Sequence, residues 1–62
     1  MEEKLRVLVE HWIEHNEEHI KKYKEWAEKL RGERDDLSKL ILESVELFEK
    51  GNQKLSEVLR RL

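Results

Sequence analysis

The sequence contains no cysteine and no proline, and it has only two glycines and four aromatic residues among 62. Without cysteine, no disulfide can staple the chain. A domain this short buries only about 60% of the surface that its unfolded form exposes, and it usually needs a disulfide, a metal or a partner chain. The sequence also lacks any run of ten apolar residues, and Met1-Glu2-Glu3-Lys4 does not begin a secretory leader. We therefore expect one small, soluble, cytoplasmic domain that does not enter the membrane.

Charge of a single sign is missing too, because 13 Lys and Arg residues are intermixed with 15 Asp and Glu residues for a net charge of −2. No electropositive stripe is available to neutralise phosphates, so neither nucleic acid nor an anionic membrane surface is an expected partner. Charged residues make up 45% of the chain, which is typical of long helices and coiled coils. The same composition, free of cysteine, resembles that of thermophile proteins.

The clearest break in the chain is Gly32, a residue suited to a left-handed helix stop, which is followed by Asp35 and Asp36 as candidate caps. On both sides of it, apolar residues recur at alternating steps of four and three. This pattern predicts an all-α, antiparallel two-helix hairpin, resembling a coiled coil, with helices over about residues 2–31 and 36–61 and a turn over about 32–35. Gly51 lies inside the second helix; the rhythm continues through it, which favours an unbroken helix over a kink or a break.

Written as heptads, each helix has a seam of a and d positions that we expect to face the other helix. The seam of the first helix contains Leu5, Val9, Trp12, Asn16, His19, Tyr23, Trp26 and Leu30, and that of the second contains Leu37, Ile41, Ser44, Phe48, Gly51, Leu55, Val58 and Leu62. Folding back at the turn pairs residue i with residue 67 minus i. This register places Tyr23 opposite Ser44 and Asn16 opposite Gly51, so large side chains face small ones.

Apolar residues also occupy the neighbouring e positions, which a lone hairpin with an a and d seam leaves uncovered. These residues are Ile13, Ile20, Ala27, Val45 and Leu59. They predict a homodimer interface, most simply between two hairpins that form a four-helix bundle. The alternative is that this flank is a groove in which the chain, as an adaptor, binds an amphipathic helix of another protein.

All three histidines, His11, His15 and His19, are spaced by four on the first helix, so that consecutive rings are neighbours. Such a ladder can chelate Zn²⁺, Ni²⁺ or Cu²⁺, with Glu14 or Glu18 as an oxygen ligand and with a dimer partner able to complete the site. The competing interpretation is structural: Asn16 and His19 are hydrogen-bonded packing residues, and no cofactor is bound. The H-x-x-E-H spacing of this segment is that of some zinc proteases, but so short a chain cannot form their substrate cleft. No serine is placed beside a histidine, so a serine nucleophile activated by a histidine base is not expected either. We therefore predict a non-enzymatic protein that acts by self-association, with metal binding as the alternative.

The segment from His11-Trp12 to Ala27, with the pattern HW-x-x-HN-x-x-H followed by Y-x-x-W-A, and the later Leu47–Asn52 segment resemble a group of short uncharacterised helical-hairpin domains from archaea and anaerobic bacteria. This resemblance covers most of the chain and brings no activity, cofactor or catalytic residue with it. It implies that His15, Asn16 and His19 belong to one polar cluster, with Asn52 as a further member.

Overall fold

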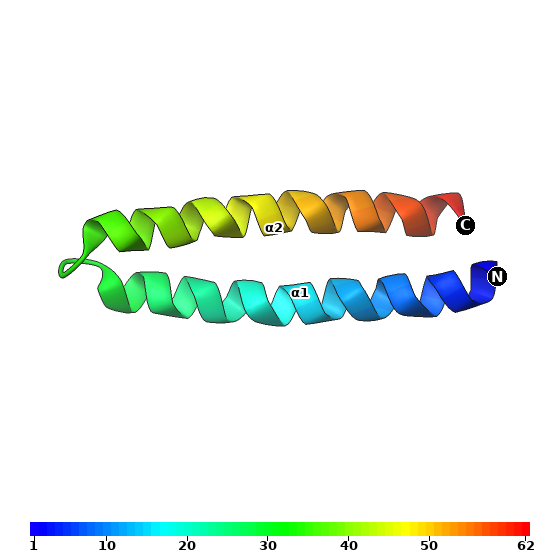
Figure 1. Ribbon diagram of the computed structural model, residues 1–62, viewed down its shortest axis with the longest axis horizontal. Helices are drawn as coiled ribbons and strands as arrows, with labels where there is room; N and C mark the ends of the chain where they lie inside the picture. The colour runs from blue at the N-terminus through cyan, green and yellow to red at the C-terminus, as the bar shows by residue number, and fades with distance from the viewer.

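The computed structural model describes all 62 residues as two long antiparallel helices, α1 over Glu2–Leu30 and α2 over Asp35–Arg61, joined by one tight turn (Figure 1). The predicted all-helical hairpin is therefore confirmed, and the helix ends lie within one residue of the predicted positions. The molecule is a rod of 48 × 14 × 11 Å, with both termini at the end opposite the turn. Neither helix is long and apolar enough to cross a membrane.

The turn is built around Gly32, whose φ of 89° lies in the left-handed region that glycine adopts without a steric penalty. The backbone N–H groups of Glu33 and Arg34 both donate to the carbonyl oxygen of Leu30, which closes the end of α1. The sequence suggested Asp35 as a side-chain cap of α2, but no side-chain hydrogen bond caps the start of this helix. Instead the carboxylate of Asp35 accepts a hydrogen bond of 2.7 Å from the backbone N–H of Gly32 and stabilises the turn itself.

Helix α2 passes through Gly51 without a break, and charges at its ends complement the helix dipole. Asp35 and Asp36 lie in its first turn, and Arg60 and Arg61 lie in its last. Arg60 and Arg61 both pair with Glu57 and thereby lower the pKa of that carboxyl. These pairs are exposed, so they contribute little to the stability of the fold.

The core between the helices is narrow and contains small or β-branched side chains. Its buried members are Val9, Ile20, Ala27, Val45 and Ser38. The predicted a and d seam is therefore wrong in part: the a residue Val9 is buried, but the d residues Trp12 and Trp26 are 44% and 56% exposed. The e residues Ile20, Ala27 and Val45 take their place in the contact between the helices.

This rotation of the seam follows from the number of apolar columns on each helix. Two packed helices can bury two columns each, whereas α1 carries three, at a, d and e. Burying the e column places Ala27 and Val45 in the contact, and side chains this small let the backbones approach closely. It also satisfies Ser38, whose hydroxyl donates a hydrogen bond of 2.8 Å to the carbonyl oxygen of Ala27. The bulky tryptophan column is left outside.

The hairpin exposes much more surface than a compact protein of its mass. Its accessible surface is 5309 Å², whereas a globular monomer of 7.6 kDa exposes about 4,300 Å². The difference, about 1,000 Å² by the same scaling, arises because a rod two helices wide has no third layer to cover its faces.

Candidate functional site: an exposed aromatic face and a histidine pair

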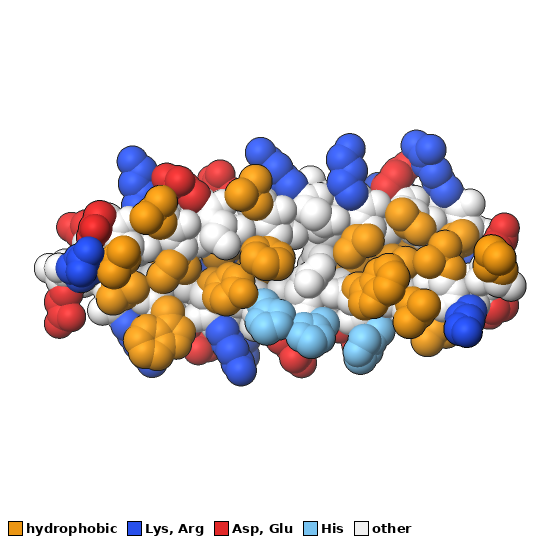
Figure 2. Space-filling view, in the orientation of Figure 1, with side chains coloured by type: hydrophobic (Ala, Val, Ile, Leu, Met, Phe, Trp, Pro, Cys, Tyr) orange, Lys and Arg blue, Asp and Glu red, His pale blue; other side chains and the backbone are white.

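One side of the hairpin carries apolar side chains from both helices, and Figure 2 shows them as two groups, one on each half of the rod, with the three histidines beside the polar gap between them. We call this surface the aromatic face. Its residues come from the a, d and g positions and are Leu8, Trp12, Tyr23 and Trp26 on α1 and Leu40, Ile41, Leu47, Phe48 and Leu55 on α2. Leu47 is 70% exposed, which is a large exposure for a leucine in a folded protein.

The aromatic face is not flat, because two shallow hollows interrupt it. Tyr23, Trp26, Ile41 and Ser44 line one of them, towards the turn. Asn16, Leu47, Phe48, Gly51 and Leu55 line the other, near the middle of the rod. The sequence predicted that Gly51 lies against Asn16 of α1, and this prediction is wrong. A Cβ atom placed on Gly51 would meet nothing within 4 Å. The hollow beside it is therefore open to a side chain from outside.

The residues predicted as the dimer interface lie elsewhere. Ile20, Ala27 and Val45 are buried within a single hairpin, and Ile13 and Leu59 are half-buried. Their assignment as an exposed interface is therefore wrong for the three buried residues, because the rotation of the seam uses this column to hold α1 against α2. The sequence carried a signal for this result, since Asn52 and Ser38 occupy the same column on α2 and need polar partners.

Of the predicted polar cluster, the structure brings Asn16 and Asn52 together. The side-chain amide of Asn16 donates a hydrogen bond of 2.8 Å to the side-chain oxygen of Asn52. The amide of Asn52 in turn donates to the carbonyl oxygen of Ile13 at 3.3 Å. Both side chains are half-buried, so this chain of hydrogen bonds links α1 to α2 near the middle of the rod. His19 is exposed and lies outside it.

The three histidines form an exposed row along α1, but they are not equally spaced. The rings of His15 and His19 are stacked, with their centroids 4.7 Å apart, and their Nε2 atoms are 2.9 Å apart. His11 stands edge-on to His15 with the ring centroids 6.4 Å apart. His19 continues the row by stacking on Tyr23, which contacts Phe48 on α2.

A complete metal cage is not formed within one chain. No group of three or more histidine or carboxylate side chains converges on a common point. Neither Glu14 nor Glu18 therefore joins the histidines as the predicted oxygen ligand. What the chain offers is the pair His15 and His19, with His11 set apart from them.

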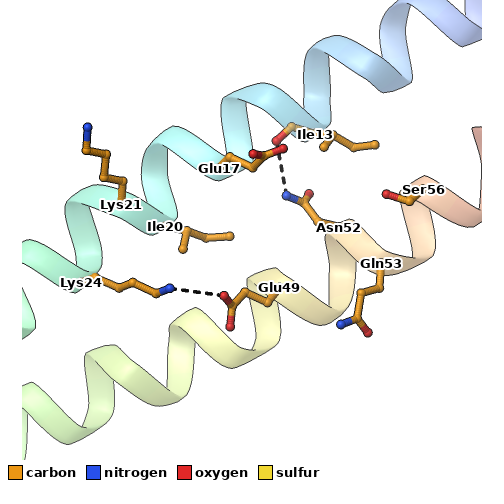
Figure 3. Close-up of a pocket in the computed structure, with 9 residues that line it drawn as sticks. All are labelled: Ile13, Glu17, Ile20, Lys21, Lys24, Glu49, Asn52, Gln53 and Ser56. Carbon is orange, nitrogen blue, oxygen red and sulfur yellow. Dashed lines mark hydrogen bonds and ion pairs between the residues drawn. The ribbon is translucent and has the colours of Figure 1, made fainter.

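The other side of the rod carries a shallow polar groove between the helices (Figure 3). Ile13 and Ile20 form part of its lining, Asn52 reaches across it, and Lys24 and Glu49 close one end through an ion pair of 3.4 Å. The remaining lining is Glu17, Lys21, Gln53 and Ser56. The charges balance and no nucleophile is paired with a base, so the groove has no arrangement suited to catalysis.

Comparisons with known proteins place this hairpin in a family. A family model described as "Domain of unknown function (DUF8180)" matches residues 5–62. The chain belongs to this family. It is also 30% identical over 59 residues to a protein of Archaeoglobus fulgidus described as "Uncharacterized protein", and the match spans 95% of this chain and 89% of that one.

No solved structure matches the chain. The family and the archaeal relative agree with the predicted resemblance to short uncharacterised domains of archaeal type. Neither of them indicates a catalytic family. The functional argument therefore rests on the two surface features of the hairpin itself, the aromatic face and the histidine pair.

Proposed function

We propose that this protein acts as a self-associating structural module, in which two copies pack through their aromatic faces to form a four-helix bundle. The observation that carries the proposal is the exposure of Trp12, Trp26 and Leu47, three large apolar residues of the aromatic face. Large apolar residues gathered in this way favour burial against a second apolar surface. The proposal moves the interface from the e column, where the sequence predicted it, to the a, d and g columns.

The excess accessible surface of the hairpin is as large as the area that each partner buries in a stable dimer. Each chain exposes about 1,000 Å² more than a compact monomer of its mass, and a stable protein interface of standard size buries about 800 Å² on each partner. Pairing two aromatic faces would therefore bring the surface of each chain close to that of an ordinary globular protein. A second copy is the simplest partner with an apolar face of the same length and shape.

The charges at the helix ends also suit a second copy. Both helices are acidic in the first turn, through Glu2 and Glu3 in α1 and the two aspartates of α2, and basic in the last turn. When two hairpins stack face to face with antiparallel neighbours across the interface, an acidic helix start lies beside a basic helix end. Such pairing of opposite charges favours correct docking more than it adds affinity.

The mass in solution tests this proposal directly. Sedimentation equilibrium at about 50 μM, a concentration well above a micromolar dissociation constant, is expected to give twice the chain mass of 7.6 kDa. Leu47→Glu should give a monomer, because an unpaired charge in a desolvated interface costs several kcal/mol. Leu42→Glu is the matched control: Leu42 is also exposed, at 46%, but lies about 140° around α2 from Leu47.

Two results would overturn the proposal. A monomer of the unchanged chain at this concentration would leave the aromatic face free for a helix of another protein, the adaptor function considered from the sequence. Equal loss of association in both leucine variants would show that the interface lies on another surface. The absence of enzymatic activity and the cytoplasmic location stay predictions from the sequence.

A further inference from the structure

We propose that His15 and His19 form a two-nitrogen chelating site for a late first-row divalent transition-metal ion of the Ni²⁺ or Cu²⁺ type. The site lies within one chain, so it does not depend on the dimer proposed above. It lies at the edge of the aromatic face along α1 (Figure 2), and neither histidine is among the apolar residues on which the self-association argument rests.

The distance between the two nitrogen atoms is the first argument. The Nε2 atoms of His15 and His19 are 2.9 Å apart. At this separation one Nε2 donates a hydrogen bond and the other accepts it, in an order that depends on the tautomers of the two rings. The accepting nitrogen therefore has its lone pair directed at the neighbouring Nε2. A metal ion can replace the shared proton.

The same distance favours one coordination geometry. If both lone pairs turn towards one ion, with metal to imidazole bonds of about 2.0–2.1 Å, nitrogens kept at this distance subtend an angle of about 90° at the metal. That is the angle between adjacent ligands in square-planar and octahedral complexes, which Cu²⁺ and Ni²⁺ prefer. A tetrahedral Zn²⁺ site needs a wider angle, and hence a larger separation of the two nitrogens.

The backbone of α1 keeps the two histidines next to each other. Residues four apart on α1 are neighbours on its surface, and α1 continues for several turns on both sides of them, so the backbone holds the two rings together before an ion arrives. His19 also stacks on Tyr23, with the ring centroids 5.9 Å apart. Both histidines are exposed, so an ion reaches them from solvent. Water fills the other coordination positions, because no third side chain converges there.

His11 provides an internal control, because it is the same residue type on the same helix at the same sequence spacing from His15. Its ring stands edge-on to that of His15, at 6.4 Å between centroids, instead of stacking on it. If proximity of two imidazoles on one helix were sufficient for metal binding, His11 would contribute as much to the affinity as His19. If the short distance between the nitrogens of His15 and His19 is required, replacing His11 leaves the metal affinity unchanged.

The experiment is a calorimetric titration of the intact protein with NiCl₂ at pH 7.5, in a buffer that does not bind metals. We expect saturable binding by the parent chain and by His11→Ala, with affinities within twofold of each other. His15→Ala and His19→Ala should each weaken binding at least tenfold, because one imidazole is left where two chelated. Lowering the pH to about 5.5 should weaken the parent's binding as well, since protons compete for the nitrogens.

A second measurement separates metal binding from a structural role of the pair. His15→Gln keeps a hydrogen-bonding side chain at this position and should retain the helix content of the parent by circular dichroism, yet lose Ni²⁺ affinity as His15→Ala does. Ni²⁺ should raise the melting temperature of the parent and of His11→Ala, but not that of His15→Gln. Equal losses in all three alanine variants, or no saturable binding by the parent, would overturn the inference. The oligomeric state measured in EDTA tests the dimer separately.

Discussion

At the scale of single residues, the polar link between Asn16 and Asn52 helps to fix how the two helices lie against each other, together with the hydrogen bond from Ser38 to the Ala27 carbonyl. Each amide satisfies a half-buried group on the other helix, since Asn16 donates to Asn52 and Asn52 donates to the Ile13 carbonyl. The apolar contacts along the rod tolerate a rotation or a slide, but this pair does not. It therefore stabilises one register over its neighbours, in the way that a buried asparagine does in coiled coils.

Asn52→Leu is expected to destabilise the hairpin by about 1–3 kcal/mol, because the half-buried amide of Asn16 then has no partner. The double variant Asn16→Leu, Asn52→Leu should cost less than Asn52→Leu alone, because it leaves no unpaired amide behind. Urea denaturation at one fixed protein concentration measures both free energies of unfolding. A double variant less stable than the single one would show that the two residues act separately and that the hydrogen bond between them contributes nothing.

The sequence predicted Asn16 and Asn52 as members of a polar cluster, but through a resemblance to other proteins and not through the helix register. The register paired Asn16 with Gly51, one residue away from its actual partner. An error of one residue on a helix is a rotation of about 100°, which is enough to exchange the buried column for the exposed one. The same resemblance assigned His15 and His19 to the cluster, but both are exposed and take no part in its hydrogen bonds.

At the scale of the elements, both helices and the turn were readable because their signals are local. Gly32, the acidic first turns and the four-three rhythm depend on neighbours in sequence. The choice of which apolar column faces the other helix is not local. It depends on the distance of closest approach that Ala27 and Val45 allow and on the partners of Ser38 and Asn52, and a periodicity analysis contains neither.

Gly51→Ala tests the corrected position of the α2 seam. Because a Cβ atom at Gly51 meets nothing within 4 Å, the change should stabilise the hairpin by about 0.5–1 kcal/mol through better helix propensity. The predicted close approach to Asn16 would instead have made an added side chain costly. Chemical denaturation at a protein concentration low enough to favour the monomer measures the difference. A less stable variant would show that another backbone occupies the hollow beside Gly51.

At the scale of the whole molecule, the hairpin is a single layer of two helices that buries few of its residues. Only five of its residues are buried, and the chain has no cysteine with which to form a stabilising disulfide. Hydrophobic stabilisation scales with the apolar area removed from water, so a second layer of helices would add the missing contribution. Folding and association of such a chain are expected to be coupled, and the stability of the fold then depends on protein concentration.

The melting temperature should therefore rise with concentration. For two chains that unfold and separate together, a tenfold increase in concentration stabilises the dimer by about 1.4 kcal/mol. With an unfolding entropy of about 2.1 cal/mol/K per residue, this shift corresponds to an increase of about 5 °C in the melting temperature. Circular dichroism at 222 nm, followed during heating at about 5, 50 and 500 μM, measures the shift.

The matched leucine variants make this melting experiment specific for the aromatic face. Leu42→Glu should keep the dependence on concentration, because its side chain lies on the other flank of α2. Leu47→Glu should melt at a lower temperature that does not change with concentration, since its charge prevents the faces from pairing. If the unchanged chain also melts at one temperature across the hundredfold range, the single hairpin is stable by itself. The narrow core of Val9, Ile20, Ala27 and Val45 would then be sufficient to hold the fold.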